Sequence, residues 1–231
     1  MYKRQRTDTS ATFTLVSPDG DQGFPGEMTA QATYTLEADA LRLTLNATTT
    51  KPCPINLSAH PYFNLAGAGA LDVNDHELVV AAESFLPTNA EQIPTGACQP
   101  VAGTPFDFRQ PVVLGSRVRG DDPQLLFARG FDHCFVLDGA AGTLPQAARL
   151  THPASGRVLE MSTDRAGLQV YTGNSLNGAL VGHGGTYRMT AGLALEAQAF
   201  PDAPNQPNFP STVLRPGERF SATIVYRFTI A

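Results

Sequence analysis

Residues 192–207 read GLALEAQAFPDAPNQP, a largely apolar run with one carboxylate near its centre that leads into a proline-rich turn. Side chains along a β-strand alternate between its two faces. A strand over this run therefore places Leu193 and Leu195 on one face and Glu196 on the other. We expect the two leucines to be buried and Glu196 to be displayed on the opposite face of the sheet.

The same alternation with a period of two recurs along most of the chain. It predicts further strands over residues 41–47, 147–152, 157–162, 168–172 and 220–230. Residues 153–156 read PASG, a turn that would close a hairpin between two of these strands. No helical periodicity extends over ten residues, and 21 Gly and 18 Pro would interrupt one. These features predict an all-β fold, a large antiparallel β-sandwich.

The composition, with 42% hydrophobic residues, suits one all-β domain as well as two smaller ones. No linker or repeat divides the chain, so we expect one domain over residues 1–231. The net charge is −5 and the 16 Lys and Arg residues are scattered, so we expect no nucleic-acid partner. No apolar run reaches the roughly 20 residues of a membrane span, and no signal peptide is evident. We therefore expect no membrane partner and a cytoplasmic location, with a periplasmic one left open.

A second informative segment, residues 54–67, reads PINLSAHPYFNLAG and sets His60 among aromatic and amide side chains. Together with residues 192–207, it resembles the aldose 1-epimerase (galactose mutarotase) family, and the likeness extends from Phe13 to Ile230. The resemblance implies the galactose mutarotase-like supersandwich, with a sugar cleft across one concave sheet face. It also implies mutarotation, the interconversion of the α and β anomers of free aldohexoses such as galactose or glucose.

Mutarotation requires a base that removes the proton of the C1 hydroxyl and an acid that protonates the ring oxygen. Glu196 falls on the position of the family's base and His60 on that of its acid. Partial burial raises a carboxyl pKa toward a useful range, and a histidine has a reference pKa of about 6.5. The residues alone leave open that Glu196 belongs to a structural ion pair and that His60 is a buried structural histidine. This chemistry requires no metal and no cofactor.

Two further residues are expected to bind the substrate. Asp132 and His133 are adjacent, so only one of them can face the cleft if they lie on a strand. The resemblance favours Asp132 as the ligand-facing residue and leaves His133 to pack or to orient backbone. It also matches Gln169 to a sugar-contacting amide of the family. Three aromatic side chains near these sites could stack on a sugar ring or equally belong to the core: Tyr62, Phe63 and Phe200.

The start of the chain departs from the family pattern. Residues 1–5 show no strand periodicity, and we interpret them as a non-native lead outside the fold. Residues 17–26 read SPDGDQGFPG, a run that members of the family carry well inside the protein. No segment corresponds to the arginine and histidine that the family carries upstream at the sugar site. We therefore expect an N-terminal portion to be missing and the chain to be a poor enzyme as it stands.

Two other functions remain open from the sequence. One is a non-catalytic carbohydrate-binding β-sandwich, inactive through loss of the N-terminal part. The other is a glycoside hydrolase domain that uses Asp132 and Glu196, whose carboxyl groups would then lie roughly 5–10 Å apart. An imidazole of His60 that faces Glu196 across a sugar-sized gap would favour epimerisation instead. A metal site could be assembled from His60 and these two carboxylates, but no closely spaced pair of His or Cys supports it.

Overall fold

The computed structural model describes residues 2–139, 143–183 and 185–231. Within these residues, nine antiparallel strands form the larger sheet, in the spatial order β1-β2-β3-β4-β19-β13-β12-β7-β10. Their bounds, in that order, are Tyr2–Arg6, Ser10–Ser17, Met28–Leu36, Ala40–Thr49, Phe220–Ile230, Arg157–Thr163, Gln146–His152, Glu77–Val80 and Val112–Val113.

The second sheet has the order β6-β17-β14-β11-β8-β9 in the part of the chain that the structure describes. These strands span Tyr62–Phe63, Leu193–Gln198, Gly167–Tyr171, Asp132–Leu137, Ala82–Phe85 and Gln99–Pro100. Two small ribbons pair β15 (Asn177–Gly182) with β16 (Gly185–Arg188), and β18 (Val213–Leu214) with β5 (Cys53–Pro54).

Helical structure is sparse. The α-helix α1 covers Pro123–Ala128, and 3-10 turns cover Asp21–Gly23, Leu114–Ser116 and Ala203–Asn205. Asp122 caps α1 by accepting a hydrogen bond from the backbone N–H of Gln124. No helix among the described residues is long and apolar enough to cross a membrane.

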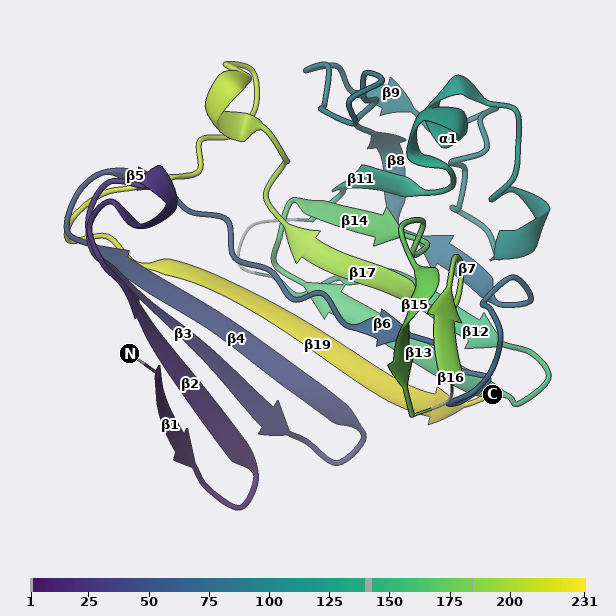
Figure 1. Cartoon of the computed structure of the whole chain (residues 1–231), viewed down its shortest axis with the longest axis horizontal. Coiled ribbons are helices and arrows are strands. Elements are labelled where there is room, and N and C mark those ends of the chain that lie inside the picture. Colours follow the sequence, from purple (N-terminus) through teal and green to yellow (C-terminus); the bar gives the residue numbers. More distant parts are fainter. Residues whose placement is uncertain (1, 140–142, 184) are drawn as a thin grey trace.

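The two sheets pack face to face as an antiparallel β-sandwich, which confirms the predicted fold class (Figure 1). On β4, Leu43, Leu45 and Ala47 are buried while the residues between them are only partly buried. On β17 the leucines of the stretch 192–207 are likewise buried. The alternation places one apolar face of each sheet in a shared core, and that burial is the main favourable contribution to stability.

The predicted strands are confirmed with small shifts at their ends. Residues 147–152 and 157–162 form the hairpin of β12 and β13, closed by the turn at 153–156. The start of the chain differs from expectation, because Tyr2–Arg6 pairs along its whole length with Ala11–Leu15 of β2. Backbone hydrogen bonds to a neighbouring strand do not require an alternating pattern, so the absence of periodicity was a poor guide here. Met1 lies outside the described residues.

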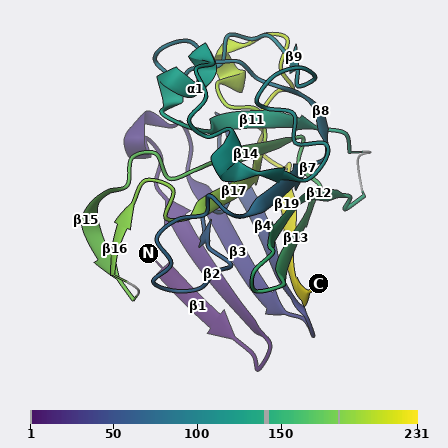
Figure 2. The same ribbon diagram turned by 90° about the vertical axis from the view of Figure 1, so that its right-hand side faces the viewer.

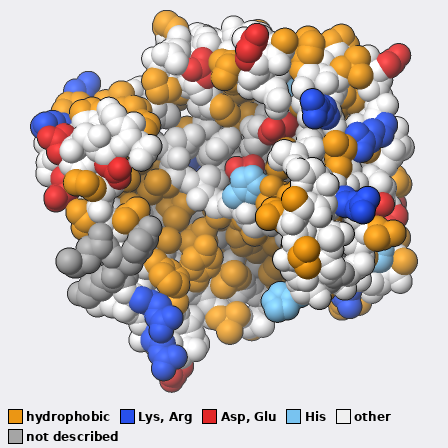
Figure 3. Space-filling model, in the orientation of Figure 1, with side chains coloured by type: hydrophobic (Ala, Val, Ile, Leu, Met, Phe, Trp, Pro, Cys, Tyr) orange, Lys and Arg blue, Asp and Glu red, His pale blue; other side chains and the backbone are white. Residues whose placement is uncertain are grey.

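The fold leaves one face hollowed. Figures 1 and 2 together show the β15–β16 hairpin projecting from the face that is turned toward the viewer in Figure 1. Figure 3 shows a hollow on this face, where acidic and histidine side chains meet and apolar side chains extend below them. Phe13 on β2 is 44% exposed and packs its ring edge-on against Tyr34.

Candidate active site

Three neighbouring strands of the smaller sheet bring the predicted polar residues onto one face. The register sets Gln169 of β14 directly opposite Glu196 of β17. It also sets Asp132 of β11 opposite Tyr171, two residues beyond Gln169 on β14. Residues opposite one another, and residues two apart on a strand, share a face of the sheet. Asp132, Gln169 and Glu196 therefore project from one patch.

His60 reaches this patch from a segment that is attached to the edge of β17 mainly through its side chains. The Ser58 hydroxyl donates to the carbonyl of Ala197 at 2.7 Å. The amide of Asn56 donates to the carbonyl of Ala199 at 3.2 Å and accepts its N–H at 2.8 Å. The segment contains prolines, which lack the N–H needed for a regular ladder. These side-chain bonds hold His60 beside Glu196.

The imidazole Nε2 of His60 lies 3.4 Å from Oε1 of Glu196, so the two groups are in direct contact and are not separated by the sugar-sized gap considered from the sequence. The His60 side chain is 44% exposed and the Glu196 side chain 16% exposed, so the imidazole is the more accessible of the two groups. The rings of Tyr62 and Tyr171 flank the imidazole, with centroids 4.9 and 5.8 Å away. The Tyr171 hydroxyl in turn contacts Ser175 Oγ at 2.6 Å.

Burial changes the proton affinity of both carboxyls. It raises the pKa of Glu196; nearby His60 opposes this shift and the Asp132 carboxylate adds to it. Burial also raises the pKa of Asp132, against the hydrogen bond from Gln169 and the charge of His60. A carboxylate with a raised pKa is a stronger base, so burial makes Glu196 a better proton acceptor.

Gln169 and Asp132 form a hydrogen-bonded pair on the floor of the site. Gln169 donates through Nε2 to Asp132 Oδ1 at 2.7 Å, while its own Oε1 is buried without a partner among the described residues. An unpaired buried acceptor is costly, and the Gln169 side chain reaches the cavity as one of its lining residues. The adjacent His133 points the other way and is fully buried against Phe106, as the alternation of a strand requires.

These side chains surround an open cavity of about 460 Å³. Its walls combine all four predicted site residues with five others: His60, Asp132, Gln169 and Glu196, together with Tyr62, Tyr171, Ser175, Gln198 and Pro201. Tyr62 was a sequence candidate for stacking on a sugar. Tyr171 and Ser175 were missed. Tyr171 could have been found from its position two residues after Gln169, whereas Ser175 lies on a turn whose direction only the fold determines.

The two other aromatic candidates from the sequence lie elsewhere. Phe63 packs against Tyr226, with ring centroids 5.2 Å apart, on the core side of β6. Phe200 packs against Phe209 at the same centroid distance, in a small separate apolar cluster. Although they are close in sequence to His60 and Glu196, neither of them lines the cavity.

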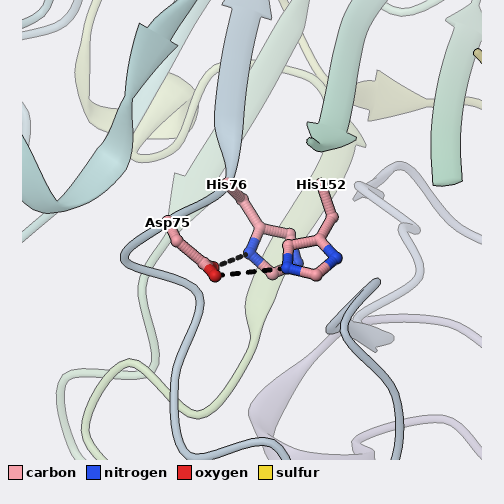
Figure 4. Close-up of side chains that lie close together, drawn as sticks. All are labelled: Asp75, His76 and His152. Atoms are coloured by element: carbon pink, nitrogen blue, oxygen red, sulfur yellow. Dashed lines mark hydrogen bonds and ion pairs between the residues drawn. The ribbon is translucent and has the colours of Figure 1, made fainter. Parts of the chain in front are cut away.

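Away from this cavity, Asp75, His76 and His152 bring potential metal ligands within 4.8 Å of one another (Figure 4). The two imidazole rings are stacked, with centroids 4.7 Å apart. Asp75 accepts from His76 Nδ1 at 2.8 Å and contacts His152 Nε2 at 3.2 Å. The donor types fit zinc, so the protonation of the rings decides whether a metal can bind.

The hydrogen bonds around His76 argue against a metal here. Its Nε2 accepts the backbone N–H of Leu65 at 2.9 Å, so the ring proton lies on Nδ1 and points at Asp75. A metal ion at Nδ1 would need a lone pair on that nitrogen, while Nε2 already uses its own lone pair to accept the Leu65 N–H. A neutral imidazole offers a lone pair on only one of its two ring nitrogens. The carbonyl of Leu65 also accepts from Arg157 Nη1 at 2.8 Å. The cluster therefore acts as a hydrogen-bonded anchor for the chain near Leu65, shortly after His60 and β6.

Comparison with known proteins finds relatives that align with almost the whole of this chain. The family model described as Aldose 1-epimerase matches residues 2–227. The chain is 43% identical to galactose mutarotase of Rattus norvegicus over 232 residues and 44% identical to that of Homo sapiens over 220 residues. It is 38% identical to aldose 1-epimerase of Escherichia coli K12 over 226 residues. The alignments cover 95–100% of this chain but only 63–66% of the relatives' lengths.

Solved structures show the same likeness. An aldose epimerase homologue from C. elegans superposes with a TM-score of 0.86 and 28% identity, covering 100% of this chain and 69% of that one. Galactose 1-epimerase from Lactobacillus acidophilus superposes with a TM-score of 0.83 and 28% identity, covering 100% of this chain and 66% of that one.

Proposed function

The chain belongs to the aldose 1-epimerase family, and from this premise we propose that it is an isomerase that interconverts the α and β anomers of free aldohexoses such as galactose or glucose. The observation that carries the proposal is the contact of His60 with Glu196 at 3.4 Å, on the wall of a cavity that Asp132 and Gln169 also line. An imidazole and a carboxylate this close can act on two neighbouring oxygens of one ligand.

The hemiacetal provides two such oxygens, because the C1 hydroxyl and the ring oxygen are bonded to the same carbon. Glu196 accepts the proton of the C1 hydroxyl while the protonated His60 donates to the ring oxygen, so that the bond between C1 and the ring oxygen breaks and the aldehyde forms. Rotation about C1–C2 presents the other face of the carbonyl. Ring closure then returns both protons and gives the other anomer.

Asp132 and Gln169 hold the sugar hydroxyls in this proposal. The carboxylate of Asp132 accepts hydroxyl hydrogen bonds, and the Gln169 amide, which lines the same cavity, provides a further polar contact beside it. Holding the distant hydroxyls fixes the chain of the opened sugar, so that only the C1–C2 bond rotates before closure.

Single-domain organisation and a cytoplasmic location stay predictions from the sequence.

Polarimetry tests the proposed function. Fresh α-D-galactose is followed with and without the purified chain, and calorimetric titration measures galactose binding to the same sample. We expect mutarotation above the spontaneous rate, in proportion to protein concentration, and no acceleration by the Glu196→Gln variant. Binding of galactose without any acceleration would instead support the alternative, a non-catalytic carbohydrate-binding β-sandwich.

A further inference from the structure

A second cavity, of about 510 Å³, adjoins the candidate active site. We call it the outer cavity. Tyr62 lines both cavities, and Leu176 of the outer cavity follows Ser175 of the active site in the chain. Residues 67–70 form one wall, and the β15–β16 hairpin forms another through Leu180 and Tyr187. A ligand held beside His60 can therefore extend past Tyr62 into this space.

The lining of the outer cavity favours an uncharged, apolar group. None of the described residues that line it is charged. Its one amide, Asn64, is fully engaged, because Nδ2 donates to the carbonyls of Asp72 and Ala191 and Oδ1 accepts the N–H of Ala66. A charged group placed here would lose its water and would find only the hydroxyls of Tyr62 and Tyr187 as further side-chain partners, whereas an apolar group would gain from burial.

The position of the outer cavity shows which end of a bound sugar would face it, given the proposed function. His60 donates to the ring oxygen in that proposal, and the ring oxygen is bonded to C5, which carries C6. Tyr62 lies beside the His60 imidazole, with ring centroids 4.9 Å apart, on the path to the outer cavity. The C6 group of the sugar is therefore the part that lies nearest to Tyr62.

We propose that the outer cavity is a subsite for an apolar group carried at C6, so that this chain favours aldoses with a C6 ether or ester of an alkyl or aryl group over aldoses with a C6 phosphate or a second sugar ring. This inference rests on the proposed function for the orientation of the sugar. The existence and apolar lining of the outer cavity do not depend on it.

The test compares four matched ligands that differ only at C6: D-glucose, 6-O-benzyl-D-glucose, glucose 6-phosphate and melibiose, in which galactose is linked to O6 of glucose. Their dissociation constants are measured by calorimetric titration with the full chain. We expect the benzyl ether to bind about 10-fold more tightly than glucose, since only part of the buried apolar area appears as affinity. The phosphate and melibiose should bind no more tightly than glucose.

The hairpin offers a matched pair of variants. Leu180 lines the outer cavity and is 62% exposed, whereas its neighbour Val181 does not line it and is 74% exposed. Both positions tolerate a polar side chain because they are largely in solvent. Leu180→Asp should reduce the benzyl preference to within about twofold, since it places a carboxylate against the ring. Val181→Asp should leave the preference unchanged.

Three results would overturn the inference: a benzyl ether that binds no more tightly than glucose, equal effects of the two aspartate variants, or an equal gain for melibiose. Polarimetry on the same samples reports the proposed function separately. A benzyl preference that depends on Leu180, without any mutarotation, would support the subsite and contradict the enzyme activity. Mutarotation of glucose without a benzyl preference would support the enzyme activity and contradict the subsite.

Discussion

The imidazole of His60 and the carboxylate of Glu196 meet at 3.4 Å, although one lies on an irregular segment and the other on a central strand. The contact depends on side-chain hydrogen bonds from Ser58 and Asn56 to the backbone beyond Glu196. The acid and the base proposed for this site are thus held together by these side-chain attachments, and the imidazole is the more exposed of the two groups.

Replacing the proposed base should abolish catalysis without unfolding the protein. Glu196→Gln keeps the size of the side chain and removes its basicity, so we expect mutarotation to fall about 10²-fold or more. Polarimetry measures the rate and circular dichroism the fold. Glu160→Gln on β13, outside the cavity, serves as the control. A Glu196→Gln variant with the parent's rate would exclude this residue as the base.

The proposed acid should affect turnover more than binding. We expect His60→Gln to lower kcat about 10²-fold while KM changes less than about threefold, because the proton is needed only as the ring opens. Progress curves over a range of galactose concentrations separate the two constants. A variant that raises KM and keeps kcat would show that His60 binds the sugar and does not donate the proton.

Replacing Gln169 should affect KM more than kcat, in contrast to His60. Gln169→Met keeps the length of the side chain but removes the amide that lines the cavity and donates to Asp132. We expect KM to rise about 10-fold, which corresponds to about 1.4 kcal/mol for lost hydrogen bonds. Gln31→Met, on β3 away from the cavity, should leave KM unchanged. Equal effects of the two variants would argue against a sugar contact by Gln169.

Burial of Asp132 should cost stability at neutral pH. Because burial raises its pKa above the unfolded value of 3.8, the folded chain binds the proton more readily, and this group lowers stability as pH rises through that window. Asp132→Asn should therefore raise the urea midpoint at pH 7 and show little gain near about pH 3, where both states are protonated. Asp138→Asn, at an exposed position, should show no such gain. A gain at Asp132 that is independent of pH would contradict the role of burial.

At His76 the effect of pH on stability should have the opposite sign to that at Asp132, because acid should destabilise the fold at this site. Burial lowers the pKa of this fully buried imidazole below the unfolded value of 6.5. Its stabilising effect is therefore complete above pH 6.5 and is lost as pH falls toward the folded pKa, because the unfolded chain then binds the extra proton. His76→Leu should cost about 1–3 kcal/mol at pH 7 by leaving the Leu65 N–H unpaired.

Urea unfolding of both proteins between pH 5 and pH 8 measures this effect, with His183→Leu at an exposed position as the control. The parent should lose stability below pH 6.5, and the His76→Leu variant should lose less. Parallel curves for the two proteins would show that His76 does not cause the acid sensitivity.

The local pattern of the sequence determined most of the strands and the direction of the key side chains. The alternation over residues 192–198 places Glu196 opposite the leucines, and the adjacency of Asp132 and His133 allows only one of them into the cleft. Such statements need only neighbouring residues, because the period of a strand is a property of the strand itself. The resemblance of residues 54–67 to a known family led to His60.

Only the tertiary structure decided which strands are neighbours and what fills the space between distant segments. The register of β11, β14 and β17 set Tyr171 into the candidate site. The fold also joined Asp75 and His76 to His152, and turned the β15–β16 hairpin into a wall of the outer cavity. Strand pairing is a contact between segments far apart in the chain, and its register depends on the packing of the whole sandwich, which no local pattern contains.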